Sequence, residues 1–463
     1  MNLKNLNRTR IAISTITAAV IVIVVIIVAV VGGVLLLTHT STTTTTSSKT
    51  IQIVFGATLS MTGSLSAFGT EQNWTLYQAV SDINSFGGIP LANGTHAMVN
   101  LIVLNDASDP TTASANLATL VSTDHAVVIL GELGGVQDST AASFATENKI
   151  PYIGPVYYSA DKNNSNAATN WVFAPFQNET NEAHIFLNWF SKIAPASNGN
   201  VTIAFFGEGD PAALANNQAG EAYAKQLGYA ICSCSNLQFT PGDTSAMTTF
   251  IQGAKSAGAE AVYGLPVPSD AVLMATTAKS LNYVPKAWLM TRGTAVAPFA
   301  ISSIGGVGNL SQGFTTSFPW NALVPYQGDM LGHTINNSQI VSEYEAYWHQ
   351  PPTLEGVYYT EVLVAADAIQ SAGNLTNTAI RQALLSGTFK TPMGTVNFAP
   401  GGQWIQSQQY ILLMQWQNRV VNGAVTPTLQ ILEPQTINTT TYEYYPFEWY
   451  ANSTNQPTIG CPC

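Results

Sequence analysis

The stretch from Ile51 to Gly69 constrains the fold of this chain more than any other. It begins with an apolar run rich in β-branched residues, which is typical of a strand buried on both faces. The run ends in a loop of small and hydroxyl residues, and a helical pattern follows from Thr70. A strand, a polar loop and a helix form the first half of a βαβ unit, in which ligands bind at the strand end. An ordinary capped turn explains this stretch equally well when it is taken alone. The rest of the chain must decide between a ligand-binding loop and such a turn.

The same alternation continues along the chain. Strands are predicted at 97–106, 126–133, 150–155, 201–206, 230–239, 261–265 and 287–290, and helices at 110–123, 138–149, 211–227, 244–257 and from 270 to 281. Three further helices are predicted at 338–349, 354–372 and 378–385, and strands at 394–398 and 410–416. This pattern indicates an α/β protein with two doubly wound parallel-sheet lobes.

The N-terminus has the pattern of a membrane anchor. Lys4, Arg8 and Arg10 precede an apolar run over residues 11–37, which is long enough to span a bilayer. The basic residues place residues 1–10 in the cytoplasm by the positive-inside rule. The run is longer than the apolar part of a cleavable signal, so we expect one retained transmembrane helix, with a cleaved signal of unusual length as the alternative. Residues 38–50 are rich in Ser and Thr and form a tether.

Composition favours an extracellular protein that binds no nucleic acid. Only 9% of the residues are charged and the formal net charge is −11, which argues against nucleic-acid or anionic-membrane surfaces. Acceptor sequences for N-glycosylation recur after the tether, and their number fits a glycoprotein outside the cell. They are at Asn73, Asn93, Asn163, Asn178, Asn200, Asn309, Asn336, Asn374, Asn438 and Asn452.

No motif in the sequence indicates catalysis. The chain has no G-x-S-x-G elbow, no H-E-x-x-H pair and no P-loop, and its six histidines lack metal-ligand spacing. Asp106 and Asp109 resemble a carboxylate pair, but we expect a strand end and a helix N-cap there. We therefore expect no enzyme activity, no cofactor and no metal.

Several motifs carry a resemblance to a known family. They are Thr62-Gly63 with Phe68-Gly69, Ile83-Asn84-Ser85-Phe86-Gly87-Gly88-Ile89, Asn105-Asp106 with Asp109-Pro110, and Gly394-x-Val396-x-Phe398 with Gln415-Trp416. Together they resemble the ABC-transporter substrate-binding proteins of the branched-chain amino-acid-binding type, over residues 51–432. The resemblance implies a type I periplasmic-binding fold, in which a three-strand hinge joins the two lobes.

The resemblance also implies where the chain changes lobes. Crossings are expected near 173–175, 289–290 and 396. The N-lobe is then formed by residues 51–173 and 291–395, and the C-lobe by residues 174–290 and 396–435, with a C-terminal tail at 436–463.

In the family, loop backbone groups and hydroxyls at strand ends hold the ligand. The residues that this implies in the N-lobe are Ser60, Thr62, Ser64, Phe68, Gly134, Gly135, Val156, Tyr157 and Tyr158. It also implies Pro266 and Ser269 in the C-lobe, and Arg292 just after the second crossing. Two positions depart from the amino-acid binders. Gly134-Gly135 stands where they carry a hydroxyl residue. Arg292, before Gly293, stands where they carry the acidic residue that pairs with the ligand ammonium. An ion pair with a carboxylate is the alternative role for Arg292.

The sequence thus predicts a membrane-anchored extracellular solute-binding protein. It captures a small polar solute, such as an amino acid or amide, between its lobes and delivers it to the permease subunits of an ABC importer. The alternative is the ligand-binding ectodomain of a surface receptor or a structural surface protein with the same fold.

Four cysteines complete the set of candidate residues. An extracellular location favours disulfides, and the even number leaves no unpaired thiol. On an extended strand, Cys232 and Cys234 have Cα atoms ~6.6–6.8 Å apart, which is near the outer limit for a disulfide. We therefore expect this pair to bridge to Cys461 and Cys463 of the tail, with a four-thiolate metal site as the rival.

Overall fold

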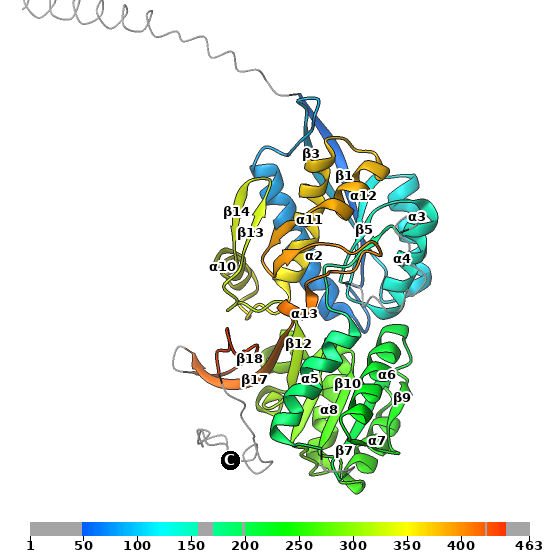
Figure 1. The fold of residues 1–463 in the computed structure, drawn as a ribbon, viewed down its shortest axis with the longest axis vertical. Helices are drawn as coiled ribbons and strands as arrows, with labels where there is room; N and C mark the ends of the chain where they lie inside the picture. Colours follow the sequence, from blue (N-terminus) through cyan, green and yellow to red (C-terminus); the bar gives the residue numbers. More distant parts are fainter. Residues whose placement is uncertain (1–48, 156–169, 197–199, 422–423, 441–463) are drawn as a thin grey trace, which may run out of the picture. The chain divides into compact units, whose positions relative to one another are not determined.

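The computed structural model describes residues 49–155, 170–196, 200–421 and 424–440 (Figure 1). The predicted anchor at 11–37, the tether at 38–48, most of the tail, Val156, Tyr157, Tyr158, Cys461 and Cys463 lie outside these residues. Within the described part of the chain, no helix has the length and apolar character needed to cross a membrane.

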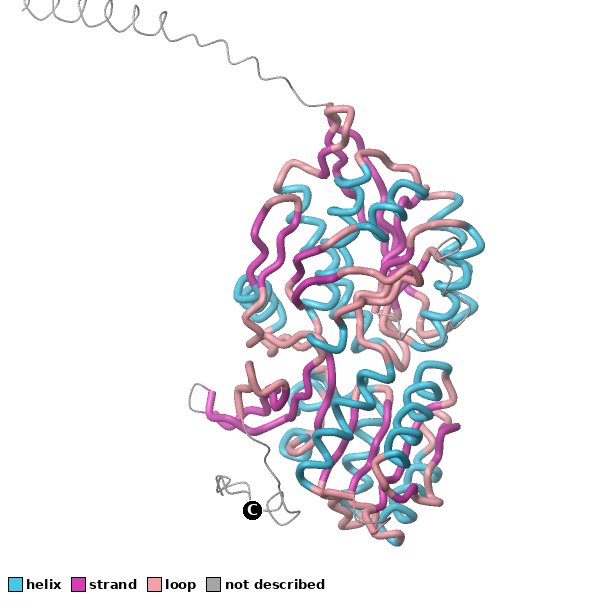
Figure 2. The backbone as a smooth tube through the Cα atoms, in the orientation of Figure 1, coloured by secondary structure: helices cyan, strands magenta, loops and turns pink. Residues whose placement is uncertain are grey.

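The N-lobe is built on a six-stranded sheet in the order β2-β3-β1-β4-β5-β6. Figure 2 draws the strands of the protein in magenta and the helices in cyan. All neighbours are parallel except β2 and β3. The strands are β1 (Thr50–Leu59), β2 (Ile89–Pro90), β3 (His96–Asn105), β4 (Ala126–Leu130), β5 (Tyr152–Ile153) and β6 (Val172–Phe173). The helices of the first half are α2 (Ser66–Ser85), α3 (Pro110–Ser122) and α4 (Gly135–Asn148). This order is that of a doubly wound sheet.

A later part of the chain completes the N-lobe. It contains β13 (Gln327–Met330), β14 (His333–Asn336), α10 (Asn337–Trp348), α11 (Glu355–Ala372), α12 (Asn377–Ser386), β15 (Phe389–Thr391) and β16 (Gly394–Val396). Helix α11 packs against α2 and against β4 and β5, so segments far apart in the sequence cover the same sheet (Figure 1).

The C-lobe repeats this architecture with a second parallel sheet, in the order β11-β10-β7-β8 with β9 beside β7. Its strands are β7 (Thr202–Glu208), β8 (Ala230–Ile231), β9 (Asn236–Phe239), β10 (Ala261–Leu265) and β11 (Ala287–Met290). Its helices are α5 (Glu179–Ile193), α6 (Pro211–Gln226), α7 (Thr244–Ser256) and α8 (Pro268–Ser280).

The second crossing between the lobes lies later than the sequence predicts. After β11 come the 3₁₀ turn η2 (Arg292–Thr294), α9 (Ala297–Ala300), η3 (Ser302–Ile304), η4 (Gly308–Ser311) and β12 (Thr315–Phe318). Helix α9 packs against α8, a bridge joins Trp288 to Phe314, and β12 pairs with β17 (Leu412–Val421). The expected crossing at 289–290 is therefore wrong, because residues 291–318 pack on the C-lobe before the chain returns to the N-lobe.

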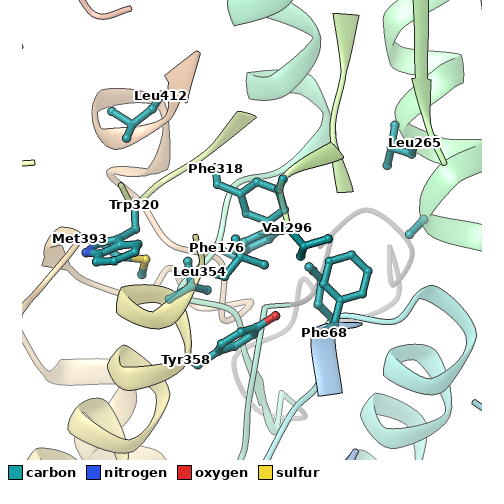
Figure 3. Close-up of a cluster of buried hydrophobic side chains, with 14 of the residues drawn as sticks. Phe68, Phe176, Leu265, Val296, Phe318, Trp320, Leu354, Tyr358, Met393 and Leu412 are labelled. Atoms are coloured by element: carbon teal, nitrogen blue, oxygen red, sulfur yellow. The ribbon is translucent and has the colours of Figure 1, made fainter. Parts of the chain in front are cut away.

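The final segments also belong beside the C-lobe. A short helix α13 (Ser407–Tyr410) follows β16, and β17 pairs with β18 (Ala424–Glu433) in an antiparallel ribbon. Figure 3 shows a cluster of buried hydrophobic side chains that includes Phe176, which follows β6, and Phe318, which ends β12. Phe176 and Phe318 lie 5.5 Å apart between ring centroids, and Phe68, Val296 and Tyr358 belong to the same buried cluster.

The predicted disulfide pairing is wrong. The sequence predicts one strand over 230–239, but the structure has two short strands, and Cys232 and Cys234 lie in the turn between them. The turn brings their Cα atoms to 5.1 Å, and the two residues form a disulfide with each other. Both the bridge to Cys461 and Cys463 and the four-thiolate metal site are thereby excluded, since both sulfurs are already bonded.

Candidate functional site

The ends of the parallel strands in both lobes carry buried carboxyl groups. In the N-lobe these are Asp106 after β3, Glu132 after β4 and Asp138 in the first turn of α4. In the C-lobe, β7 ends at Glu208, and Asp210 is the N-cap of α6. Carboxyl ends of parallel strands are where ligands bind in open α/β sheets, so these groups occupy the expected place of a ligand site.

In the N-lobe, the carboxyl groups are held by neutral donors. The backbone N–H of Ser60 donates to Oε2 of Glu132 at 2.7 Å, and the Ser60 hydroxyl donates to Oδ1 of Asp106 at 2.7 Å. Asp138 accepts from the backbone N–H of Gly134 at 3.0 Å and from the Tyr152 hydroxyl at 2.9 Å. Two of the predicted ligand-binding residues, Ser60 and Gly134, therefore bond the chain's own carboxyl groups.

Burial dominates the ionisation of these N-lobe groups. Burial first, and then the nearby Asp106 and Asp138, raise the pKa of Glu132 well above its usual value. Burial raises the pKa of Asp138 to about 8, while the bonds from Gly134 and Tyr152 oppose this shift. Asp138 therefore favours its protonated, neutral form at neutral pH.

In the C-lobe, the carboxyl groups are held by a cation. Nη1 of Arg292 lies 2.6 Å from Oδ2 of Asp210 and 3.3 Å from Oε2 of Glu208, and the Arg292 side chain is only 6% exposed. Arg292 has a left-handed backbone with φ of 60°. Burial raises the pKa of Glu208 to about 8, although Arg292 lowers it. The alternative role for Arg292, an ion pair with a carboxylate, is therefore what the structure shows.

The two sets of strand ends meet at the start of α4 and α6. These helices pack against each other, and Arg292 is close enough to Asp138 to lower its pKa. A Cβ atom on Gly135 would lie 2.2 Å from Oδ1 of Asp210. A side chain at this position would therefore displace the Asp210 carboxyl group, and glycine leaves room for the close approach of the two lobes.

The remaining predicted residues lie in three kinds of place. Phe68 is 1% exposed in the core, because α2 begins at Ser66 and not at Thr70 as predicted. Pro266 accepts from the backbone N–H of Gly293. Thr62, Ser64 and Ser269 are exposed and do not join the buried carboxyls. The roles of all these residues in ligand binding remain predictions.

Apart from Asp106, these carboxyl groups were not predicted from the sequence. Glu132, Glu208 and Asp210 lie at or just after the end of a strand, and that position is the signal that was available; Asp138 lies in the first turn of the helix that follows β4. Among the described residues, no group of three or more His, Cys, Asp or Glu side chains has the arrangement of a metal site.

Two α/β lobes whose strand ends face each other define the class of two-lobed solute-binding proteins. The chain belongs to the periplasmic binding protein family, whose model matches residues 52–421. The predicted family is thus confirmed. No curated protein sequence shows significant similarity to the chain.

Solved structures share the fold at low sequence identity. A leucine-binding protein from Thermotoga maritima has a TM-score of 0.65 at 18% identity, with 83% of this chain and 99% of the other covered. A branched-chain amino acid transporter substrate-binding protein from Streptococcus pneumoniae in complex with isoleucine has a TM-score of 0.63 at 17% identity, with 83% of this chain and 100% of the other covered. A solute-binding protein from Rhodopseudomonas palustris in complex with 3,4-dihydroxybenzoic acid has a TM-score of 0.60 at 15% identity, with 83% of this chain and 99% of the other covered.

Proposed function

We propose that this protein is an extracellular solute-binding protein of an ABC importer, held at the membrane by residues 11–37. It captures a small polar solute, such as an amino acid, an amide or a related compound, between its lobes and delivers it to the permease. The observation that carries the proposal is the approach of Gly135 on α4 to Asp210 on α6, which brings the strand ends of both lobes together. Closure of two lobes around a ligand is how such proteins present it to a partner.

The strand-end groups narrow the chemistry of the solute. Donors that would hold a ligand carboxylate, such as the Ser60 backbone N–H and the Gly134 backbone N–H, already bond Glu132 and Asp138. Arg292 already bonds Glu208 and Asp210. The solute is therefore one that offers hydrogen-bond donors to carboxyl groups, and among the proposed solutes an amide fits better than an amino acid, which carries a free carboxylate.

The location outside the cell is part of the same proposal. Residues 38–50 give the folded part a polar tether, and three of the predicted glycosylation acceptors, Asn93, Asn200 and Asn374, are exposed. Glycosylation at these positions would face solvent and leave both sheets undisturbed.

The test is to identify what the protein carries. The full chain is purified in detergent, and mass spectrometry identifies the small molecules released on unfolding. Each is then added back while the melting temperature and the radius of gyration are measured. A cognate solute raises the melting temperature by linkage and decreases the radius of gyration. Scattering curves that superimpose with and without a stabilising solute would contradict lobe closure.

A further inference from the structure

A cavity lies at the first turns of α2, and its lining includes none of the strand-end carboxyl groups. It has a volume of about 270 Å³ and lies between α2 and α10 of the N-lobe and the segment from α9 to η3 of the C-lobe. Ser66, Thr70 and Glu71 line it from the first turns of α2, whereas Phe68 of the same helix belongs to the hydrophobic core. The cavity is therefore separate from the site described above.

Polar groups at this cavity lack protein partners. Oε1 of Glu71 and Nε1 of Trp348 are buried, and neither has a hydrogen bond within the described residues. Glu71 is only 5% exposed. A buried donor or acceptor without a partner costs about 1–3 kcal/mol, so a ligand that bonds both groups would gain this energy.

Glu71, the acidic residue at the cavity, lies near a second buried carboxyl group, that of Glu355. The Thr353 hydroxyl donates to Oε2 of Glu71 at 3.2 Å, and the Thr353 backbone N–H donates to Oε2 of Glu355 at 2.7 Å. Burial, and then Glu355, raise the pKa of Glu71 well above its usual value, and the hydroxyls of Thr353 and Tyr344 oppose this shift. A protonated carboxyl both donates and accepts hydrogen bonds, so this wall of the cavity does not demand a positively charged ligand.

The unpaired groups select a hydroxyl-bearing ligand over a cation. The indole N–H of Trp348 needs an acceptor, and an ammonium group has none. A hydroxyl accepts from Trp348 and donates to Oε1 of Glu71. Tyr344 and Trp348 add aromatic surface to the same wall, and aromatic rings combine a large apolar area with few rotatable bonds. This combination suits the flat apolar face and the hydroxyl edge of a sugar ring.

We propose that this cavity is a second ligand site that binds a neutral, hydroxyl-rich molecule about the size of a monosaccharide. The proposal is independent of the solute bound at the strand ends. Pro298 and Ile304 line the cavity from the C-lobe, and Ser66, Thr70, Glu71 and Trp348 line it from the N-lobe. A bound ligand therefore contacts both lobes and stabilises their closed arrangement.

The experiment compares two tryptophan variants of the full chain. D-glucose, D-galactose, D-mannose and myo-inositol are each titrated into the protein by calorimetry. Trp348→Phe keeps an aromatic ring but removes the N–H, and we expect it to weaken binding about tenfold. Trp74→Phe is the matched control. Trp74 lies on α2 with its ring centroid 5.3 Å from that of Tyr344, but it does not line the cavity. We expect its affinity to equal that of the unmodified chain.

Thr70→Val keeps the shape of a wall residue and removes its hydroxyl, so it tests the same site without changing an aromatic residue. Equal affinity in the Trp348 and Trp74 variants would overturn the proposal, as would the absence of binding for all four compounds. Binding of choline in their place would assign the cavity to a cation and overturn it too. Sugar binding that is lost in Ser60→Ala but kept in Trp348→Phe would place the sugar at the strand ends and overturn the second site.

Discussion

The strand ends of the two lobes hold buried carboxyl groups in different ways. In the N-lobe, neutral donors from Ser60, Gly134 and Tyr152 bond Glu132 and Asp138. In the C-lobe, the guanidinium of Arg292 bonds Glu208 and Asp210. The carboxyl groups at the same topological position are thus held by neutral donors in one lobe and by a guanidinium group in the other. This difference predicts which substitutions cost the most unfolding free energy and which have an effect on stability that depends on pH.

The largest effect is expected from Arg292→Met. It leaves two carboxyl groups without their cation in a buried place, which typically costs about 3–5 kcal/mol of unfolding free energy. Lys192→Met is the control, because Lys192 is 58% exposed in its pair with Glu433 and exposed pairs contribute about 0–1 kcal/mol. Denaturant unfolding at neutral pH measures both. Similar losses in the two variants would show that the C-lobe pair is not the structural cation site described here.

The next effect is a loss of stability as pH rises. In the unfolded chain Asp138 ionises near its usual pKa of about 3.9, whereas in the folded protein its pKa is about 8. Its stabilising contribution is therefore complete below the unfolded pKa and is lost as pH rises through about 8. We expect Asp138→Asn to be more stable than the unmodified chain at pH above about 8, by about 1–3 kcal/mol.

The measurement is the melting temperature of both proteins across this pH range. Because the asparagine side chain of the variant cannot ionise, the variant should lose less stability on going from acidic to alkaline buffer. A variant whose profile runs parallel to that of the unmodified chain would show that Asp138 is ionised throughout.

A smaller effect is expected from Tyr152→Phe, which removes one donor to Asp138. The loss should be about 1 kcal/mol at acidic pH and greater at alkaline pH, because an ionised acceptor makes the stronger bond. Tyr283→Phe is the matched control, since its hydroxyl donates at 2.8 Å to the backbone carbonyl of Ala259. Its cost should not change with pH across the titration of Asp138. Unfolding curves of both variants at two pH values measure the two costs. Equal pH dependence of the two costs would show that the Tyr152 hydroxyl does not bond a titrating Asp138.

The smallest effect on stability is expected from Gly135→Ala. Alanine gains about 0.5–1 kcal/mol over glycine in a helix, and displacement of Asp210 offsets this gain. The substitution should instead hinder lobe closure, because the added Cβ would lie 2.2 Å from Oδ1 of Asp210. We expect an unchanged unfolding free energy within about 1 kcal/mol and a larger radius of gyration by scattering. An unchanged radius would show that the lobes close without this contact.

Local signals in the sequence predicted many elements of the fold, but not α5 (Glu179–Ile193) or β18 (Ala424–Glu433). The strands Ala261–Leu265 and Ala287–Met290 have the predicted bounds, and Asp109 caps the helix that begins at Pro110. These features depend on apolar runs and capping residues that are adjacent in the chain. The turn at Cys232–Cys234 was not predicted, because an apolar run that is interrupted by a turn looks the same as one continuous strand.

By itself, the sequence determined the alternation of strands and helices, the family and the strand ends at which polar groups gather. The tertiary structure decided which of these groups meet. Ser60 and Glu132 are separated by 72 positions, and Glu208 and Arg292 by 84. Their bonds depend on the packing of whole lobes, as does the burial that raises the pKa values of the carboxyl groups. The second crossing was placed too early for the same reason, since the packing of α9 against α8 and the pairing of β12 with β17 assign residues 291–318 to the C-lobe.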